Sequence, residues 1–202
     1  MSTRGTIGFR VSENDKVTYN HSDSYPTWLG IQVMSFILNT PESELKDIAN
    51  RIELVDEDSK PSSELIEAYR GYADTDVATQ TLTDWYCLLR HTQGELEHYR
   101  NGVRHMIDYS TFLHDSLFCE WAYIINLDTQ ELEIYKGFNK NKKGKGRYAS
   151  KFIAPDRIGE KVEYYGVTLL TTMKLSDIRN MSEESIKVFC QALEESVYNR
   201  NN

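Results

Sequence analysis

The segments of this chain that favour β-structure lie towards its two ends, with a long helical and polar stretch between them. Residues 3–20 alternate weakly around a polar turn at Glu13-Asn14-Asp15 and predict a hairpin. Apolar and aromatic runs at 118–127, 132–138 and 162–173 predict three more strands. A lone hairpin is too small to bury its apolar face, so it must pair with the late strands. We therefore expect an α+β fold whose mostly antiparallel sheet is covered by helices on one or both faces.

Helices are expected between the two groups of strands and at the C-terminal end. The first covers about 28–38, and a second begins after Thr40-Pro41 and reaches about 51. A third follows Ser62, and another covers about 84–90 and could continue past Gly94 to Arg100. Ser182 caps an amphipathic helix that reaches about Tyr198.

Length and charge pattern indicate one domain over residues 1–202 with two unusual segments. An acidic helical insertion covers about 41–76, where residues 42–76 hold eleven acidic and four basic side chains. From 136 to 161 there are nine basic and two acidic side chains, and glycines and lysines predict a mobile, solvated loop at about 139–151. The opposite charges would attract each other, within one chain or across a homodimer.

Composition narrows the function and the compartment. A net charge of −8 disfavours a dedicated nucleic-acid-binding protein. The sequence has no apolar stretch long enough for a membrane span and no apolar signal core at its start. Three widely spaced cysteines favour a reducing cytoplasm, and the five histidines show no ligand spacing with them, so no metal or other cofactor is expected.

Several short motifs resemble a family of uncharacterised bacterial and phage proteins. The likeness begins with Thr3-Arg4-Gly5-Thr6-Ile7-Gly8-Phe9 and continues with Tyr19-Asn20-His21-Ser22-Asp23-Ser24-Tyr25-Pro26, where a related form reads Tyr-Cys-His-Trp-Asp-Gly-Tyr-Pro. Later matches are Asp84-Trp85-Tyr86, residues 115–123, Tyr135-Lys136-Gly137-Phe138, Arg147-Tyr148 and residues 164–167. The resemblance covers nearly the whole chain and implies a cytoplasmic prokaryotic or phage protein, with a host-interaction or anti-defence role in a phage.

The loop after the hairpin is the densest group of reactive side chains. It places His21, Asp23, Ser24 and Tyr25 within a few positions, and such loops often carry function at strand ends. Asp23 or Ser24 could equally hold the turn through hydrogen bonds to the backbone. With Arg4 and Tyr19, this loop is one candidate site for a small anionic molecule, such as a nucleotide, or for a host protein.

The N-terminus suggests a second hypothesis, an amidohydrolase of the N-terminal-nucleophile type. Removal of Met1 would expose Ser2, and a terminal Ser2 or Thr3 could use its own α-amine as the base. His21 and Asp23 would orient that group, and Arg4 could stabilise an oxyanion. This hypothesis predicts the two-sheet sandwich of those hydrolases, although no further motif of theirs is recognisable downstream.

The predicted strand at 118–127 contains one residue that is costly to bury, Glu120. Period two would place Cys119 with Trp121 and Tyr123 on one face and Glu120 on the other. A carboxylate there needs water or a partner, so Glu120 is a candidate binding residue with Arg4 or Arg147 as its partner.

The basic loop is the last candidate binding site. Lys145, Arg147 and Tyr148 could contact an anionic ligand, and Phe138 and Tyr148 could stack on a base in a nucleic acid. The loop lacks the spacing of a phosphate-binding P-loop. We therefore rank a non-enzymatic binding protein first, the hydrolase second and nucleic-acid contact third.

Overall fold

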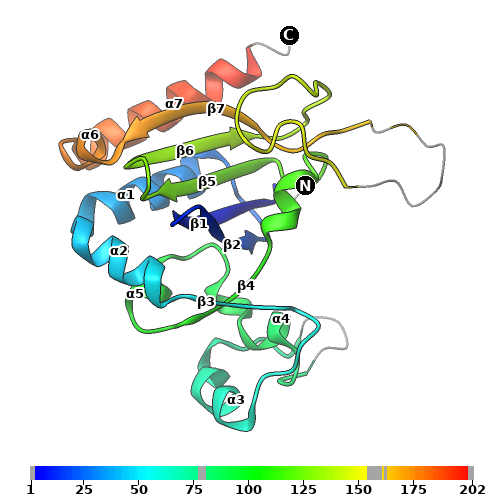
Figure 1. The fold of residues 1–202 in the computed structure, drawn as a ribbon. Coiled ribbons are helices and arrows are strands. Elements are labelled where there is room, and N and C mark those ends of the chain that lie inside the picture. The colour runs from blue at the N-terminus through cyan, green and yellow to red at the C-terminus, as the bar shows by residue number, and fades with distance from the viewer. Residues whose placement is uncertain (1–2, 77–80, 154–160, 162, 200–202) are drawn as a thin grey trace.

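A five-stranded sheet forms the centre of the molecule (Figure 1). The computed structural model describes residues 3–76, 81–153, 161 and 163–199. In the order in which they neighbour one another, the strands are β2 (Asn14–Asn20), β1 (Gly5–Val11), β5 (Trp121–Asn126), β6 (Glu131–Lys136) and β7 (Thr168–Lys174). Only the pairing of β1 with β5 is parallel within this sheet. The fold is α+β, and the mostly antiparallel sheet that starts from an N-terminal hairpin is confirmed.

The β1–β2 hairpin turns at Ser12 and Glu13, slightly earlier than the polar tripeptide predicted. Both residues have positive φ, 50° and 62°, as in the mirror-image turns that suit the twist of a hairpin. The carboxylate of Asp128, in the β5–β6 turn, accepts hydrogen bonds from the amides of Ser12 and Glu13 at 2.7 and 2.9 Å. One turn is therefore fastened to the other.

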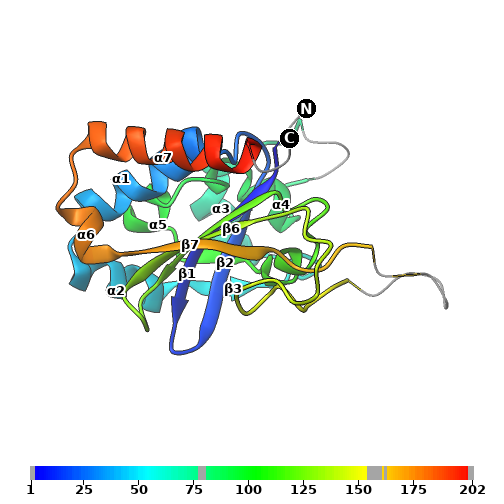
Figure 2. The same ribbon diagram turned by 90° about the horizontal axis from the view of Figure 1, so that it is seen from above.

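Helices cover one face of the sheet. A π-helical turn (Pro26–Gly30) leads into α1 (Ile31–Asn39), which packs beside α7 (Glu183–Tyr198) and also contacts α6 (Leu175–Arg179). The helix α2 (Glu42–Arg51) lies at the same end of the molecule as α6 (Figure 2). The apolar side chains of the sheet that belong to this core are fully or almost fully buried, among them Ile7, Phe9, Tyr123, Ile125 and Ile134. The alternation of these residues along their strands explains why this face holds the main core.

The helix expected over about 84–90 is present but short, and its suggested continuation past Gly94 to Arg100 is wrong. The chain instead forms α4 (Trp85–Leu88), a 3-10 turn (Arg90–Thr92) and α5 (Glu97–Arg100). Gly94 lies between them with φ +79°, and a Cβ on it would come within 2.3 Å of Asn20 Oδ1. The close approach of this segment to the end of β2 therefore requires a break in the helix.

A smaller lobe lies below the sheet in Figure 1. It holds a parallel pair, β3 (Glu53–Val55) and β4 (His105–Ile107), together with α3 (Ser63–Tyr69) and a following 3-10 turn (Arg70–Tyr72). Buried residues of the lobe join the same core cluster as the main sheet; examples are Tyr69, Leu88, Tyr99 and Met106. The acidic segment 41–76 therefore packs on a core shared with the sheet.

Irregular segments cover the other face of the sheet. A 3-10 turn (Ser110–His114) and the chain around Tyr148 pack on Ala122 and Ile124. Cys119 belongs to this second cluster, so the prediction that it shares a face with Trp121 and Tyr123 is wrong. The reason is that β5 begins at Trp121, so the strand period does not extend back to Cys119.

A half-buried ionic network fixes the basic loop to this face. Arg147 donates to Glu133 Oε1 at 2.6 Å and to Asp15 Oδ1 at 3.3 Å. The hydroxyl of Tyr148 donates to Asp15 Oδ2 at 2.6 Å, and Glu133 also accepts from Asn126. The C-terminal part of the loop is thus anchored on strands β2 and β6.

The hydrolase hypothesis predicts a sandwich of two large sheets, which the described residues do not form. Their second sheet consists of β3 and β4 alone, and β4 contacts the edge strand β2. Within the same residues, no helix combines the length and apolar character needed to cross a bilayer.

Candidate functional site

Hydrogen bonds fix the loop that follows β2. The side-chain amide of Asn20 donates to Ser24 Oγ at 2.8 Å, and the Ser24 amide donates to the carbonyl of Thr3 at 3.1 Å. The buried hydroxyl of Tyr123 donates to the Ser24 carbonyl at 3.0 Å. The loop is therefore held against the beginning of β1 and the middle of β5.

A polar cavity of 230 Å³ lies between this loop and the segment that follows α4. Its lining residues are Asn20, His21, Ser22, Asp74, Arg90, His91, Gln93 and Glu95. Pockets that enclose drug-sized ligands usually exceed about 300 Å³. This cavity suits a phosphate, a carboxylate or a small organic acid rather than a whole nucleotide.

Arg90 and Gln93 supply the most unusual feature of the cavity wall. Arg90 Nη1 donates to Gln93 Oε1, and the guanidinium carbon lies 5.6 Å from the centre of the Tyr86 ring. Arg90 Nε and Gln93 Nε2 are both buried and have no hydrogen-bond partner in the described chain. Buried donors are nearly always bonded, so these two atoms are unusual, and both belong to side chains that line the cavity.

Tyr19 and His21 stand beside this wall under the influence of two cations. Tyr19 Oη lies 3.3 Å from His21 Nδ1. Burial lowers the pKa of His21 below its usual value of 6.5, and the charges of Arg90 and Arg4 lower this pKa further. Both arginines also oppose the rise that burial causes in the pKa of Tyr19. His21 is therefore mostly neutral at pH 7, in a region of positive potential.

Arg4 approaches from the beginning of β1. Its side chain is exposed, and its guanidinium carbon lies 5.2 Å from the centre of the Phe118 ring. Within the part of the chain that the structure describes, neither Arg4 nor Arg90 forms an ion pair with a carboxylate. Both guanidinium groups thus keep their charge available to an anion.

Two carboxylates on the cavity wall carry the opposite sign. Glu95 pairs with His98 at 3.0 Å, and Asp74 accepts a hydrogen bond from the Asp76 amide at 2.9 Å. These carboxylates disfavour an anion next to them, so the side of the cavity formed by Arg90 and His21 is the better place for one.

The structure brings some of the predicted site residues together and separates others. Thr3, Arg4, Tyr19, His21 and Ser24 lie around the start of β1 and the end of β2. Asp23 and Tyr25 line a different cavity, of 350 Å³, with Thr27 and Trp28. Glu120 adjoins Arg4 through the backbone, because its amide donates to the Arg4 carbonyl at 3.0 Å.

The candidate binding residues of the basic loop lie away from the cavity beside Arg90. Arg147 is engaged by Glu133 and Asp15, so the suggested pairing of Glu120 with Arg147 is wrong. Tyr148 is buried and bonded to Asp15, and Lys145 is exposed, with its backbone bonded to Thr168. None of these three lines the cavity beside Arg90.

Sequence reasoning missed Arg90 and Gln93, together with Asp74. The available signal was the polar run Arg90-His91-Thr92-Gln93-Gly94, which follows directly after the apolar Leu88-Leu89. The sequence suggests a continuing helix here, and only the packing of Gly94 against Asn20 turns this run towards the loop after β2.

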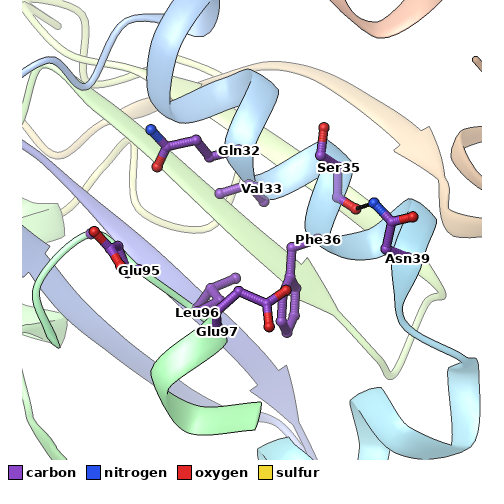
Figure 3. Close-up of a pocket in the computed structure, with 9 residues that line it drawn as sticks. Gln32, Val33, Ser35, Phe36, Asn39, Glu95, Leu96 and Glu97 are labelled. Carbon is purple, nitrogen blue, oxygen red and sulfur yellow. Dashed lines mark hydrogen bonds between the residues drawn. The ribbon is translucent and has the colours of Figure 1, made fainter. Parts of the chain in front are cut away.

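A larger cavity, of 370 Å³, lies between α1 and residues 94–97 (Figure 3). Phe36 and Leu96 supply apolar surface, and Glu95 and Glu97 add carboxylates. Ser35 on its rim donates to Glu183 at 2.6 Å. Since its charged lining residues are acidic, this cavity is unsuited to an anion.

The residues of the hydrolase hypothesis are only partly described. Ser2 lies outside the described residues, and Thr3 is buried with its carbonyl bonded to Ser24. Thr3 therefore adjoins the 20–24 loop, as that hypothesis requires, but Asp23 lines the separate cavity with Trp28.

Comparison with known protein families, with curated proteins and with solved structures found no match. Within residues 3–76, 81–153, 161 and 163–199, no group of histidine, cysteine and acidic side chains could hold a metal ion.

Proposed function

We propose that this protein is a non-catalytic binding protein that holds a small anionic ligand in the cavity beside Arg90. The observation that carries the proposal is the pair of buried donors, Arg90 Nε and Gln93 Nε2, without an acceptor in the described chain. A buried donor without a partner costs about 1–3 kcal/mol. The oxygen atoms of a phosphate or a carboxylate would satisfy both donors.

The surrounding charges support an anion over a neutral ligand. Burial lowers the pKa of the His21 imidazole, and the charges of Arg90 and Arg4 lower it further. A bound anion would offset those charges and favour the protonated imidazole, which would then act as a further donor. Binding should therefore tighten as the pH falls towards the pKa of His21.

The size of the cavity favours a small molecule over the larger alternatives. At 230 Å³ it would enclose the charged group of a nucleotide while leaving the nucleoside outside. An acidic side chain of a host protein would meet the same donors, but it would need a projecting segment to reach them. The three cysteines are free and buried, which supports a reducing cytoplasm as the place of action.

The test is thermal unfolding with and without simple anions at millimolar concentration. Inorganic phosphate, pyrophosphate and AMP should each raise the midpoint, because a ligand of the folded state stabilises it by mass action. Adenosine, which lacks the phosphate, should not. An absence of any shift with all three anions would refute the proposal.

Two matched variants identify the site. Arg90→Gln removes the charge and the Nε donor, and should weaken binding about 10- to 100-fold, as expected for loss of a charged hydrogen bond. Arg104→Gln removes an equal charge from an exposed side chain in the lobe and should leave binding unchanged. Equal losses in both variants would indicate non-specific attraction instead.

One contact keeps the hydrolase as a second candidate. Ser24 holds Thr3 beside the loop that carries His21, so a processed N-terminus would begin next to that histidine. The intact mass of the purified protein decides the matter. Retained Met1 would exclude a terminal Ser2 or Thr3 as nucleophile, whereas its removal would justify a search for amidase activity.

A further inference from the structure

Three aromatic rings on separate segments each carry a cation above them. Arg4 lies over Phe118, Lys136 Nζ lies 4.7 Å from the centre of the Phe138 ring, and Lys140 Nζ lies 4.9 Å from that of Tyr164. Phe118 and Phe138 are 46% and 49% exposed, although large apolar side chains are normally buried.

Backbone hydrogen bonds join the three segments into one surface. The Phe138 amide donates to the Ser116 carbonyl at 2.6 Å, and the Tyr165 amide donates to the Asn139 carbonyl at 2.8 Å. The segments carrying Phe118, Phe138 and Tyr164 are therefore direct neighbours. We call these three rings, with Arg4, Lys136 and Lys140, the aromatic–lysine surface.

A strongly basic loop continues from this surface. Residues 136–151 contain seven basic and no acidic side chains. Arg147 is used internally, but Lys142, Lys143 and Lys145 are exposed. Nearby carboxylates include Glu163, which pairs with Lys140 at 3.5 Å, and Glu120, which acts on Lys136. Asp115 adds another, since its carbonyl accepts from the Phe118 amide. The net charge here is positive, although the chain as a whole carries −8.

The backbone at Phe138 is in a conformation that bulky side chains seldom adopt. Its φ is +56°, in the left-handed region that favours glycine. A strained position that holds a half-exposed ring outward is poorly explained by folding, since glycine would serve better there. Strain of this kind is often found at binding sites.

We propose that the aromatic–lysine surface binds single-stranded nucleic acid. Unpaired bases would stack on Phe118, Phe138 and Tyr164, and Lys142 and Lys143 would neutralise phosphates as the strand continues over the loop. A duplex keeps its base faces covered and could not use the rings. An acidic peptide would meet the lysines but has no flat faces to stack. This surface is distinct from the cavity beside Arg90, with only Arg4 adjoining both.

The test uses the whole protein and a fluorescent oligothymidylate of about 12 nucleotides, within the range that such surfaces cover. Fluorescence anisotropy at several salt concentrations gives the affinity and its salt slope. The duplex of the same length and polyglutamate, a polyanion without bases, serve as competitors. The single strand should bind, and neither competitor should displace it at equal charge.

Phe138→Gly separates binding from folding. Glycine fits φ +56°, so the thermal midpoint should not fall, while loss of one stacking ring should weaken the strand about tenfold. The double change Lys142→Gln with Lys143→Gln should reduce the salt slope by about 1.4, because each contact to a single-strand phosphate contributes about 0.7. Lys46→Gln with Lys187→Gln, on exposed helix faces, makes the same change in net charge and should leave the slope unaltered.

Three outcomes would overturn the proposal. Absence of binding at low salt removes it outright. Equal displacement by polyglutamate, with Phe138→Gly binding as well as the unchanged protein, would make the surface a site for acidic proteins. Equal effects of the two lysine pairs would show that only net charge matters.

Discussion

Arg90 is positioned by two neighbours of different kinds. The Gln93 amide oxygen accepts one of its guanidinium protons, and the Tyr86 ring lies close to the same group. These contacts fix the plane of the guanidinium while leaving Nε without a partner. An arginine so held needs little ordering when an anion arrives, and preorganisation of this kind favours tight binding.

The charge of Arg90 should be measurable at His21. Arg90→Gln removes one of the two charges that lower the pKa of His21, so this pKa should rise towards 6.5. NMR titration of the imidazole protons reports the value directly. Arg104→Gln is the control and should leave it unchanged. The proposed geometry would be wrong if the pKa of His21 were the same in the unchanged protein and in Arg90→Gln.

Asp128 should stabilise the hairpin turn more than a surface carboxylate usually does. It accepts two backbone hydrogen bonds from residues held at positive φ. Asp128→Ala should therefore lower the free energy of unfolding by about 1–2 kcal/mol, as for loss of a capping carboxylate. Glu13→Gly should act in the opposite direction, because glycine relieves the φ of 62°. Urea denaturation of both variants measures the two effects, and equal signs would contradict this account.

At the scale of the element, the basic loop combines two kinds of charge. Its C-terminal part is fixed to the sheet by Arg147, whereas its lysines project into solvent. Glu133 is only 6% exposed, and its carboxylate accepts hydrogen bonds from Arg147, Asn126 and Tyr135. The anchor and the exposed lysines therefore have separate roles, in stability and in recognition.

Arg147→Gln should be among the most destabilising single changes in this loop. It leaves the Glu133 carboxylate buried without its cation, and we expect a loss of about 2–4 kcal/mol in the free energy of unfolding. Changing Lys140 to Gln breaks the exposed pair with Glu163 and should change the free energy of unfolding far less, because water screens such a pair. Guanidinium denaturation compares the two, and similar losses would show that the network contributes little.

Elements that depend on neighbouring residues in the sequence could be predicted, and those that depend on distant contacts could not. The last helix starts where Ser182 indicates, because its Oγ accepts from the Ser185 amide one turn ahead. The break after α4 could not be foreseen, since the constraint on Gly94 comes from Asn20. The same holds for the site. The loop after β2 attracted attention through its composition, whereas Arg90 gains its place only from the folded chain.

Across the whole molecule, tyrosines are the titratable groups most affected by folding. The chain has thirteen, and the structure raises the pKa of seven: Tyr19, Tyr99, Tyr109, Tyr123, Tyr135, Tyr148 and Tyr198. Burial is the main cause in every case, and it raises the pKa of Tyr99 to about 12. The neutral phenol is therefore the form that the fold favours.

This predicts a steep loss of stability in alkali. A phenol with a raised pKa in the folded state contributes stability that is complete below its unfolded pKa of about 10 and declines as the pH rises above it. Absorbance of phenolate at 295 nm should show exposed tyrosines ionising first and the buried ones ionising together with unfolding. A single smooth titration, with circular dichroism unchanged above pH 11, would contradict the burial of these side chains.

The parallel pairing of β1 with β5 has a consequence for how the protein is made. Gly5 pairs with Trp121, so β1 finds this neighbour only after more than a hundred further residues have been synthesised. Until then the hairpin presents an apolar strand with one unpaired edge, which is the kind of edge that joins other chains. A nascent chain that stops before residue 121 should therefore depend on chaperones, and the final sheet should form only late in synthesis.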